Sequence, residues 1–512
     1  MQLQALLSGF VDTSHDFTIT GLCLDSRQIT EGQVFVALAA ADQSALMNVQ
    51  QAVARGARAV IYDPKDVDLS NWIVAAQGKN NTVNSGVFLA IPALDTQLGA
   101  IAARYYAQPS SKLDVIGITG TNGKTSCTQF LGQLLDACGI IGTLGWGVWG
   151  DLTFTGYTTP DALATQTMLA AFVGQGQRTV AMEVSSHGIA EGRINSVRFK
   201  GVVLTNISRD HLDFHGTMAA YIATKQVLFT RTDTEFAVFN LDDALSGQFM
   251  AVVPQSIAIW GFGIIKDANT AFDQTTFVAR KQFVYAQHIR HQADGLAFEI
   301  GWQDQLQTLQ VPLYGDFNVE NILAVVTVLL ALGESLATIA AKLQMLKPVN
   351  GRMQRFGNPQ SALIFVDYAH TPDALEKALI SARQHCKKAL WVVFGCGGDR
   401  DTGKRPQMGA CAAQYADHVI ITDDNPRSED PASITQAIVA GFQRQSTLNA
   451  AHLSVIHDRE HAIQTAIGQA AIDDCIVIAG KGHEQYQEIN GQKLPFSDAQ
   501  VVIKLLADTA VA

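Results

Sequence analysis

The sequence lacks the long apolar segments and leader patterns that would place its 512 residues in or across a membrane. Its longest apolar run, from Ile322 to Gly333, is too short to span a bilayer and indicates a buried helix. The N-terminal segment has neither a basic start nor a long apolar core, so no signal peptide is predicted. We therefore expect a protein without a membrane span.

Cysteine and positive charge are also scarce. The seven cysteines are scattered and include no CxxC pair, which argues against a disulfide scaffold or a zinc site and favours a reducing cytoplasm. The formal net charge of −11 argues against a nucleic-acid partner, although it allows local binding of one anionic ligand. Hydrophobic residues make up 47% and charged residues 16% of the chain, as in ordinary globular proteins, and the length predicts about two to four domains.

The hydrophobic pattern divides the chain into three α/β regions. The first ends in a helical stretch and a Pro/Ser linker near Lys112, after which a βαβ pattern begins. The segment after the GKT sequence is predicted to form an amphipathic helix closed by Gly139. Beyond the sequence KPVNGRMQRFG, four apolar strands alternate with helices, as in a doubly wound domain whose ligands bind beyond the carboxyl ends of the strands. We therefore predict an α/β fold with a mostly parallel central sheet and with domains at residues 1–95, 96–349 and 350–512.

The sequence ITGTNGKTS, residues 118–126, lies between an expected strand and an expected helix. Gly120 and Gly123 allow backbone amides to turn towards a phosphate, Lys124 supplies positive charge, and the hydroxyl of Thr125 can hold magnesium. The strict P-loop pattern is not met, because an isoleucine stands at its first glycine position. The strand–turn–helix context with GKT nevertheless predicts a loop that binds nucleotide phosphates rather than a plain tight turn.

Two further expected strands end in side chains that could bind a metal ion. Magnesium favours oxygen ligands, so Glu183 in MEVSSHG suits it together with the hydroxyl of Thr125. His211 in TNISRDHLDFHG is, by residue type alone, more often a packed or capping histidine. Lys225, in a helical stretch further on, is by itself more often solvated, although burial beside another cation lowers the pKa of a lysine and lets it act in a site.

Nine motifs occur in one order: TGTNGKTS, MEVSSHG, TNISRDHLDFHG, GDFNVENILA, NGRMQR, VDYAHTPDAL, GCGGDRDTGKRP, DDNPRSEDP and GKGHEQYQ. Together they resemble the Mur ligases, and most of all the branch of that family that uses meso-diaminopimelate. The resemblance runs from about Gly21 to about Asp498. The resemblance implies a small α/β N-terminal domain that binds the UDP end of a substrate, a central P-loop ATPase domain, and a C-terminal Rossmann-like domain that binds an amino acid.

The reaction that the resemblance implies is ATP-dependent amide formation in peptidoglycan precursor synthesis, and hence in cell-wall biogenesis. Meso-diaminopimelate would be joined to the D-Glu side-chain carboxylate of UDP-N-acetylmuramoyl-L-alanyl-D-glutamate through an acyl phosphate. The protein would mainly position the reactants and neutralise their charge. We expect these two substrates and ATP as the ligands, no nucleic acid, and a monomer.

The resemblance also implies roles for individual residues. The expected catalytic residues are Lys124, Lys225 and His211. The expected ATP-binding residues are Gly120, Thr121, Asn122, Gly123, Lys124, Thr125, Ser126, Asn318, Arg352 and Asp367. The expected metal ligands are Thr125, Glu183, His211 and Lys225, whose amine the family carbamylates with carbon dioxide.

Two further sets concern the other substrates. The expected residues for the UDP-linked substrate are Leu24, Ser26, Thr158, Thr159, Ser185, Glu191 and Arg193. The expected residues for diaminopimelate are Arg400, Asp424, Asn425, Pro426, Arg427, Gly480 and Glu484. Meso-diaminopimelate differs from lysine by a second carboxylate at its far end, which suits bidentate recognition by Arg427, with Asp424 and Asn425 beside the ammonium. The role of His370, in DYAHTPD, is open between turn stabilisation and function.

Several positions depart from the family pattern. The segment from Ala40 to Ser44 replaces an expected Gly and His, Tyr157 stands where Asn is common, Glu191 stands where some relatives have Gln, and Gln354 replaces a frequent Glu. The uracil and ribose contacts are therefore not fixed by the resemblance.

Three alternatives to a diaminopimelate-adding ligase are considered. A lysine-adding ligase lacks DNPR in the family pattern, whereas this chain has it. A folylpolyglutamate synthetase lacks the N-terminal UDP domain. A nonenzymatic nucleotide-binding regulator should have lost Lys124, Glu183, His211 or Lys225, and this chain keeps all of them.

Overall fold

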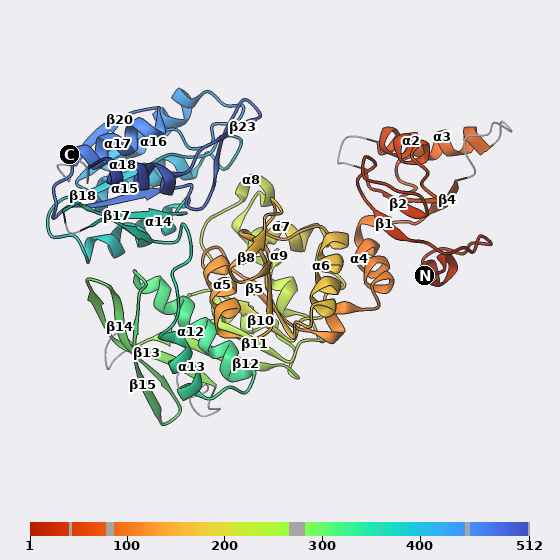
Figure 1. Ribbon diagram of the computed structural model, residues 1–512, viewed down its shortest axis with the longest axis horizontal. Helices are drawn as coiled ribbons and strands as arrows, with labels where there is room; N and C mark the ends of the chain where they lie inside the picture. The colour runs from red at the N-terminus through yellow and green to blue at the C-terminus, as the bar shows by residue number, and fades with distance from the viewer. Residues whose placement is uncertain (40–43, 78–85, 266–281, 359, 446–450, 510–512) are drawn as a thin grey trace. The chain divides into compact units, whose positions relative to one another are not determined.

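The computed structural model describes residues 1–39, 44–77, 86–265, 282–358, 360–445 and 451–509 (Figure 1). They form two compact units. Unit 1 comprises Met1–Gly117 and Ala137–Lys200, and unit 2 comprises Ile118–Asp136 and Gly201–Ala512. The domain boundaries expected from the sequence stay a prediction. Among the described residues, none of the helices combines the length and the apolar character needed to cross a bilayer.

The N-terminal part of unit 1 is a parallel sheet with helices on both faces. Its strands follow the chain order: β1 (Gly21–Cys23), β2 (Gln33–Ala37), β3 (Ala59–Tyr62) and β4 (Val87–Ala90). Val34 and Val36 pack with α1 (Leu3–Leu7) and α4 (Leu94–Tyr105). Phe35 and Ala37 pack on the other face with α2 (Leu46–Ala54) and α3 (Val67–Gln77). Successive side chains of a strand point to opposite faces, so one apolar strand supplies both cores.

The rest of unit 1 surrounds two further parallel strands, β6 (Cys138–Gly142) and β9 (Thr179–Glu183). The other elements are η1 (Pro109–Lys112), β7 (Gly145–Val148), β8 (Asp151–Thr153), α6 (Ala162–Gly174) and α7 (Ser186–Ala190). The expectation of a helix closed by Gly139 is wrong, because Gly139 lies inside β6 and pairs with Val148. A side chain at Gly139 would come within 2.7 Å of the ring of Phe172, so close packing explains this glycine.

Strand β5 (Asp114–Thr119) crosses from unit 1 into unit 2, where α5 (Lys124–Leu134) follows it. The first part of unit 2 contains the parallel strands β10 (Gly201–Leu204), β11 (Phe236–Asn240), β12 (Ala258–Ile264) and β13 (Phe283–Gln292). Antiparallel β14 (Gly295–Trp302) and β15 (Gln305–Val311) extend the sheet. The expected buried helix is confirmed as α12 (Asp316–Ala331). The remaining elements are α8 (Leu212–His215), α9 (Met218–Gln226), η2 (Val227–Phe229), α10 (Ser246–Met250) and α13 (Leu336–Leu343).

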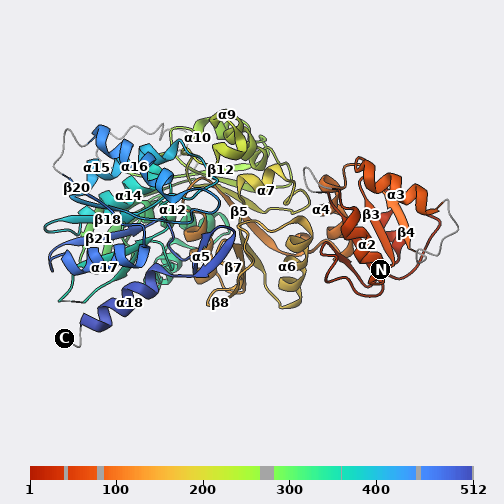
Figure 2. The same cartoon turned by 90° about the horizontal axis from the view of Figure 1, so that it is seen from above.

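The last part of unit 2 is a second sheet in the order β16-β17-β21-β18-β19-β20. Its strands are β16 (Gln354–Phe356), β17 (Leu363–Asp367), β21 (Cys475–Ala479), β18 (Leu390–Phe394), β19 (His418–Ile421) and β20 (His452–Val455), all parallel except β16. The four apolar strands expected from the sequence are confirmed as β17, β18, β19 and β21. Helices cover both faces (Figure 2): α14 (Pro372–Arg383), α15 (Lys404–Tyr415) and α16 (Pro431–Gln445) on one, and α17 (Arg459–Gln469) and α18 (Asp498–Thr509) on the other. A hairpin of β22 (Tyr486–Ile489) and β23 (Gln492–Pro495) follows β21.

Candidate active site

The phosphate loop forms the predicted turn between β5 and α5. Gly120 has a φ of +140°, and any side chain there would collide with the hydroxyl of Thr205, so only glycine fits. Thr121 accepts a hydrogen bond from the amide of Ser208 at 2.9 Å, and the amide of Asn122 donates to Asn206 Oδ1 at 2.9 Å. The loop is therefore fixed by the segment that follows β10.

The two side chains that begin α5 are held by polar groups of unit 2. Lys124 Nζ donates to the carbonyls of Gly120 and Thr121, each at 2.9 Å. Thr125 is buried, and its hydroxyl accepts a hydrogen bond from Arg352 Nη2 at 3.2 Å. This contact brings together two of the residues that the sequence assigned to ATP.

Two residues from the part of unit 2 that contains the second sheet, Asp373 and Asp401, contact the phosphate loop and the loop after β10. Asn122 Nδ2 donates to Asp373 Oδ2 at 3.1 Å, at the start of α14. Arg209, in the loop after β10, forms an ion pair with Asp401, with 3.1 Å between Nε and Oδ2. The pKa of Asp401 is lowered, because hydrogen bonds from Arg209 and from an amide outweigh the effect of its burial.

Lys225 on α9 is buried, with only 1% of its surface exposed. Its amine donates to two neutral acceptors, Thr119 Oγ1 at 3.2 Å and the carbonyl of Gly120 at 3.0 Å. Burial and the charge of Lys124 hold the pKa of Lys225 well below its ordinary value, and the more weakly acting charge of Asp210 raises it. The lysine that would be solvated by residue type alone is therefore buried, in surroundings that favour its uncharged, nucleophilic form.

A carboxylate between two histidines lies at the entry to α8. Asp210 Oδ2 is 3.2 Å from Nε2 of His211 and 3.8 Å from Nε2 of His370. Asp210 is buried, which raises the pKa of its carboxyl. The neighbouring histidines and Lys404 lower that pKa by more, so the carboxyl stays ionised. His370 also contacts the carbonyl of Tyr368 through Nδ1 at 2.8 Å.

Two other residues assigned to ATP are buried within unit 2. Asp367, at the end of β17, accepts hydrogen bonds from the amides of Met353 at 2.6 Å and Ala369 at 2.8 Å, and burial raises its pKa. Asn318 on α12 donates to the carbonyl of Tyr314 at 2.8 Å and accepts a hydrogen bond from Asn321 at 3.2 Å.

Glu183, the expected metal ligand of unit 1, ends β9 and is almost fully buried. Its carboxylate accepts hydrogen bonds from the amide and the hydroxyl of Thr143, at 2.9 and 3.0 Å. The Thr143 hydroxyl in turn contacts that of Thr158 at 3.0 Å. Among the residues that the structure describes, no group of three or more His, Cys, Asp or Glu side chains could hold a metal ion. Oxygen donors such as Glu183 and Thr125 fit magnesium, which usually retains several waters.

The residues expected to bind the UDP-linked substrate form a second polar group in unit 1. Thr159 Oγ1 donates to the carbonyl of Glu183 at 3.0 Å and contacts Ser185 Oγ at 3.0 Å. Arg193 Nη1 donates to the carbonyl of Thr159 at 2.6 Å. Arg193 also forms an ion pair with Glu191, whose carboxylate thus offsets the arginine charge.

Two of the positions that depart from the family pattern, Glu191 and Tyr157, contact Arg193. Tyr157 is 59% exposed, and its ring centroid lies 5.4 Å from Cζ of Arg193. In the N-terminal sheet, Ser26 donates to Gln51 Oε1 at 2.6 Å, and Leu24 is half-buried. Ser44 donates to Asp66 Oδ1 at 2.8 Å, whereas the expected departures at Ala40, Ala41 and Asp42 lie outside the described residues.

The DNPR loop follows β19 and pairs with the β22–β23 hairpin. The amide of Arg427 donates to the carbonyl of Glu488 at 3.0 Å, and its carbonyl accepts from the amide of Asn490 at 2.8 Å. Its guanidinium Nη1 donates to the carbonyl of Gly398 at 2.6 Å, and its Nε lies 3.3 Å from Glu488 Oε2. Arg427 is therefore fixed between the loop after β18 and the β22–β23 hairpin. Arg400, in contrast, is exposed and donates to the carbonyl of Asp399 at 2.9 Å.

Other residues assigned to diaminopimelate meet beside this loop. Asn425 Nδ2 donates to Glu484 Oε2 at 2.9 Å. Gly480 has a φ of +110°, and a side chain there would collide with the carboxylate of Asp424, so glycine allows the two loops to approach. Pro426 is buried in the same loop. The loops after β19 and β21 thus bring together residues more than fifty positions apart.

Sequence reasoning missed several buried polar residues around these loops. Lys481 contacts both Asn425 and Glu484. His483 lies 3.5 Å from Nη1 of Arg352, and burial together with the charges of Arg352 and Lys481 lowers its pKa to about 3. Lysine and histidine in a polar loop are usually solvated, so residue type gave no signal. The glycines on either side of Lys481 were the available hint of a constrained turn.

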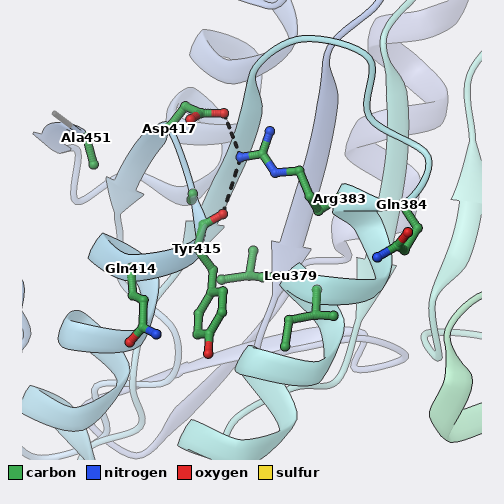
Figure 3. Close-up of a pocket in the computed structure, with 9 residues that line it drawn as sticks. Leu379, Arg383, Gln384, Gln414, Tyr415, Asp417 and Ala451 are labelled. Atoms are coloured by element: carbon green, nitrogen blue, oxygen red, sulfur yellow. Dashed lines mark hydrogen bonds and ion pairs between the residues drawn. The ribbon is translucent and has the colours of Figure 1, made fainter. Parts of the chain in front are cut away.

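A pocket of about 440 Å³ lies elsewhere in unit 2, beside the ends of α14 and α15 (Figure 3). Arg383 donates to Asp417 Oδ2 at 2.7 Å and to the carbonyl of Tyr415 at 3.3 Å. None of the expected site residues is among the described residues that line it. Asp417 precedes β19, so the pocket is at the amino end of a parallel strand, opposite the end where such sheets bind ligands.

The comparison with known proteins agrees with this geometry. Residues 118–329 match the Mur ligase middle domain, and residues 351–482 match the Mur ligase glutamate ligase domain. The parallel sheets, the GKT loop and the strand-end loops are those of an ATP-dependent ligase. The chain belongs to the Mur ligase family.

Individual relatives extend over the whole chain. It is 42% identical to a UDP-N-acetylmuramoyl-L-alanyl-D-glutamate–2,6-diaminopimelate ligase of Xanthomonas oryzae pv. oryzae, over 100% of this chain and 98% of that protein. Its identity to a Pseudomonas aeruginosa protein of the same name is 41%, over 97% of each chain. A solved structure with that name matches with a TM-score of 0.66 and 33% identity, over 100% of this chain and 99% of the other. MurF ligase of Thermotoga maritima in complex with ADP matches with a TM-score of 0.63 at 18% identity, a likeness of fold.

Proposed function

We propose that this chain is the ligase that joins meso-diaminopimelate to the D-Glu side-chain carboxylate of UDP-N-acetylmuramoyl-L-alanyl-D-glutamate, at the expense of ATP. The full-length relatives of that name support the reaction. The single structural observation that most supports the choice of amino acid is Arg427, whose guanidinium is held between Gly398, in the loop after β18, and Glu488, in the β22–β23 hairpin.

The amino-acid site would distinguish diaminopimelate from lysine by charge. Arg427 would bind the distal carboxylate, and the acidic side chains Asp424 and Glu484 would bind the distal ammonium. Lysine lacks that carboxylate and would leave the guanidinium without its substrate partner. Loss of a charge-assisted contact of this kind costs about 1–3 kcal/mol, which corresponds to roughly tenfold to hundredfold discrimination. Arg400, Asn425, Pro426 and Gly480 would complete the site.

The phosphate loop would bind ATP. Backbone amides from Gly120 to Ser126 would face its phosphates, Lys124 would offset their charge, and Asn318, Arg352 and Asp367 would complete the site. Magnesium held by Thr125, Glu183 and His211 would neutralise further phosphate charge. The D-Glu carboxylate would take up the γ-phosphoryl group, and the amine of diaminopimelate would displace phosphate from the resulting acyl phosphate.

Lys225 would serve the metal site as a carbamate. Carbon dioxide reacts with an uncharged amine, and burial together with the charge of Lys124 lowers the pKa of this amine and so favours its uncharged form. The product is an anion, which the charge of neighbouring Lys124 would stabilise and which offers oxygen atoms to magnesium. His370 would hold Asp210 in its ionised form beside His211.

Unit 1 would bind the UDP-linked substrate. The hydroxyls of Ser26, Thr158, Thr159 and Ser185 and the guanidinium of Arg193 suit its phosphate and carboxylate groups, with Leu24 beside them. Glu191 would offset part of the positive charge that Arg193 presents to the substrate, because the two side chains form an ion pair. We further propose that the enzyme acts in the cytoplasm as a monomer with domains at residues 1–95, 96–349 and 350–512.

The proposal is tested by measuring phosphate release with ATP and the UDP-linked dipeptide as the amino acid is varied. We expect release that depends on meso-diaminopimelate and is at least about tenfold slower with L-lysine at equal concentration. Turnover with L-lysine and none with meso-diaminopimelate would identify the chain as a lysine-adding ligase instead. Nucleotide binding without phosphate release for any amino acid would favour a regulator.

A further inference from the structure

Lys481 is a fully buried lysine, with 0% of its surface exposed, two residues beyond the end of β21. Its ammonium donates to Asn425 Oδ1 at 3.0 Å and to Glu484 Oε2 at 2.9 Å. It also lies 5.6 Å from the ring centroid of Tyr486. A buried charge is tolerated when it is paired and hydrogen-bonded, and Lys481 meets both conditions.

These contacts fix the orientation of the Asn425 amide. A lysine ammonium and a backbone amide can only donate hydrogen bonds, and an ionised carboxylate can only accept them. The amide oxygen must therefore face Lys481 and the amide of Glu488, which lies 2.9 Å away, and the amide nitrogen must face Glu484 at 2.9 Å. The reversed amide would place two donors against each other on one side and two acceptors on the other.

The orientation determines what the site presents to an amino acid. Both lone pairs of Asn425 Oδ1 are taken by Lys481 and Glu488, so this oxygen is not available to a substrate ammonium. The anionic partners left for that ammonium are then the carboxylate of Asp424 and, next to Lys481, the carboxylate of Glu484. The position of the Glu484 carboxylate depends on Lys481, because the lysine and Asn425 both donate to the same oxygen atom.

Lys481 also joins two loops that come from different strands. Asn425 follows β19, whereas Lys481 and Glu484 follow β21, and these strands are not neighbours in the sheet. The bond between Lys481 and Asn425 therefore sets the distance between the two halves of the proposed amino-acid site. The same Asn425 oxygen binds the amide of Glu488, whose carboxylate contacts Arg427.

We propose that Lys481 is a positioning residue of the amino-acid site, whose buried ammonium holds Asn425 and Glu484 as one hydrogen-bonded unit and thereby orients Glu484 for the substrate ammonium. This inference rests on the proposed function. It assigns the recognition of the ammonium to carboxylates, that of Glu484 among them, rather than to the oxygen of Asn425. In this role Lys481 would act through Asn425 and Glu484 rather than by contact with the reacting groups.

The test measures KM for meso-diaminopimelate and for ATP in the full-length enzyme with Lys481→Met and Lys481→Gln. Methionine removes the ammonium at similar size, whereas glutamine keeps an N–H donor without the charge. We expect KM for diaminopimelate to rise about tenfold or more in Lys481→Met and by a smaller factor in Lys481→Gln, with KM for ATP changed less than about twofold. If Lys481→Met does not fold, Lys481→Gln still gives the measurement.

Lys342→Met is the matched control, because Lys342 also forms a 2.9 Å ion pair with a glutamate, Glu334, outside the site. It should leave both KM values unchanged. A second measurement adds Glu484→Gln: in the Lys481→Met background it should raise KM for diaminopimelate much less than it does alone, because the two residues act together.

An unchanged KM for diaminopimelate in a folded Lys481 variant would overturn the inference, as would equal rises in KM for both substrates. These outcomes differ from failure of the proposed function, which is judged on the wild-type enzyme. If the wild type uses L-lysine instead, the same KM comparison is made with L-lysine. A rise confined to the amino acid would then still support the positioning role.

Discussion

Lys225 and Lys481 are both buried lysines of unit 2, but their surroundings give them opposite chemistry. Lys225 donates to a hydroxyl and a carbonyl and lies near the charge of Lys124. Lys481 donates to the carboxylate of Glu484 and to an amide oxygen. The first arrangement favours loss of the proton and a reactive amine, whereas the second uses the charge to hold other groups in place. Burial alone therefore does not determine the chemistry of a lysine. The charge of the groups that accept its hydrogen bonds does.

The largest effect is expected when the reactive amine is removed. Lys225→Ala should lower kcat by at least about a hundredfold, because the anion that the carbamate supplies is lost. A short carboxylic acid or high bicarbonate should restore part of the rate by supplying a replacement anion. The control on the same helix is Thr224→Ala, because the Thr224 hydroxyl donates to the carbonyl of Ala220 within that helix. A Lys225→Ala enzyme with the wild-type rate would remove this lysine from the mechanism.

The next effect concerns the arginine beside the Lys481 network. Arg427→Ala should reduce the preference for meso-diaminopimelate over L-lysine by about tenfold to hundredfold, because the distal carboxylate loses its partner. The ratio of kcat/KM for the two amino acids gives this preference, and KM for ATP is the internal control. Arg400→Ala should have a smaller effect, since that side chain is exposed. Retention of the wild-type preference in Arg427→Ala would show that another group reads the carboxylate.

Replacing each of the two lysines by methionine should also change the free energy of unfolding in opposite directions. In buffer free of carbon dioxide at neutral pH, Lys225→Met should raise the free energy of unfolding, because it removes the cost of burying an amine whose folded pKa is lowered. Lys481→Met should lower it by about 1–3 kcal/mol, because Glu484 loses the cation that compensates it. Denaturant unfolding of the three proteins measures both changes. Changes of the same sign would contradict the contrast between the two sites.

The pH dependence of the Lys225→Met effect follows from the lowered pKa. Between the folded pKa and the unfolded value of 10.5, the unfolded chain binds a proton that the folded chain does not, so wild-type stability rises with pH. The advantage of Lys225→Met should therefore shrink as pH rises and vanish above the unfolded pKa. An advantage that grows with pH would mean that the folded amine is charged.

The smallest effect is expected at the ion pair between Arg209 and Asp401. Asp401→Asn should lower the free energy of unfolding at neutral pH by no more than about 1 kcal/mol, since Arg209 is partly exposed. The pKa of Asp401 is lowered, so its stabilisation is present above the unfolded pKa and is lost as pH falls through the folded pKa. The difference between wild type and variant should disappear in acid. A difference that persists there would point to a lost hydrogen bond rather than a lost charge.

The sequence predicted the structural features that depend on a local pattern of residues. The GKT loop after an apolar strand, the four strands of the last sheet and the buried helix α12 all follow from periodicity and turn residues. Gly139 was misread because a glycine after a helical pattern resembles a helix end, while its actual role is to make room for Phe172, which is distant in sequence. Strand β20 was not expected because it is short and largely exposed.

Long-range polar contacts were beyond the reach of the sequence. Three contacts join segments that are more than fifty residues apart in the sequence. They are the hydrogen bond from Lys481 to Asn425, the hydrogen bond from Arg352 to Thr125, and the ion pair between Arg209 and Asp401. Lys225 illustrates the same limit, because its residue type alone favours solvent and only the packing of α9 against the phosphate loop buries it.

The selection of meso-diaminopimelate over L-lysine by this ligase can be measured in a competition experiment. Wild-type enzyme, ATP and the UDP-linked dipeptide are incubated with equal concentrations of meso-diaminopimelate and L-lysine, and the product is identified by its mass. We expect the product with diaminopimelate to be in at least about tenfold excess over the product with lysine. A product that contains mainly lysine would contradict the proposed selection.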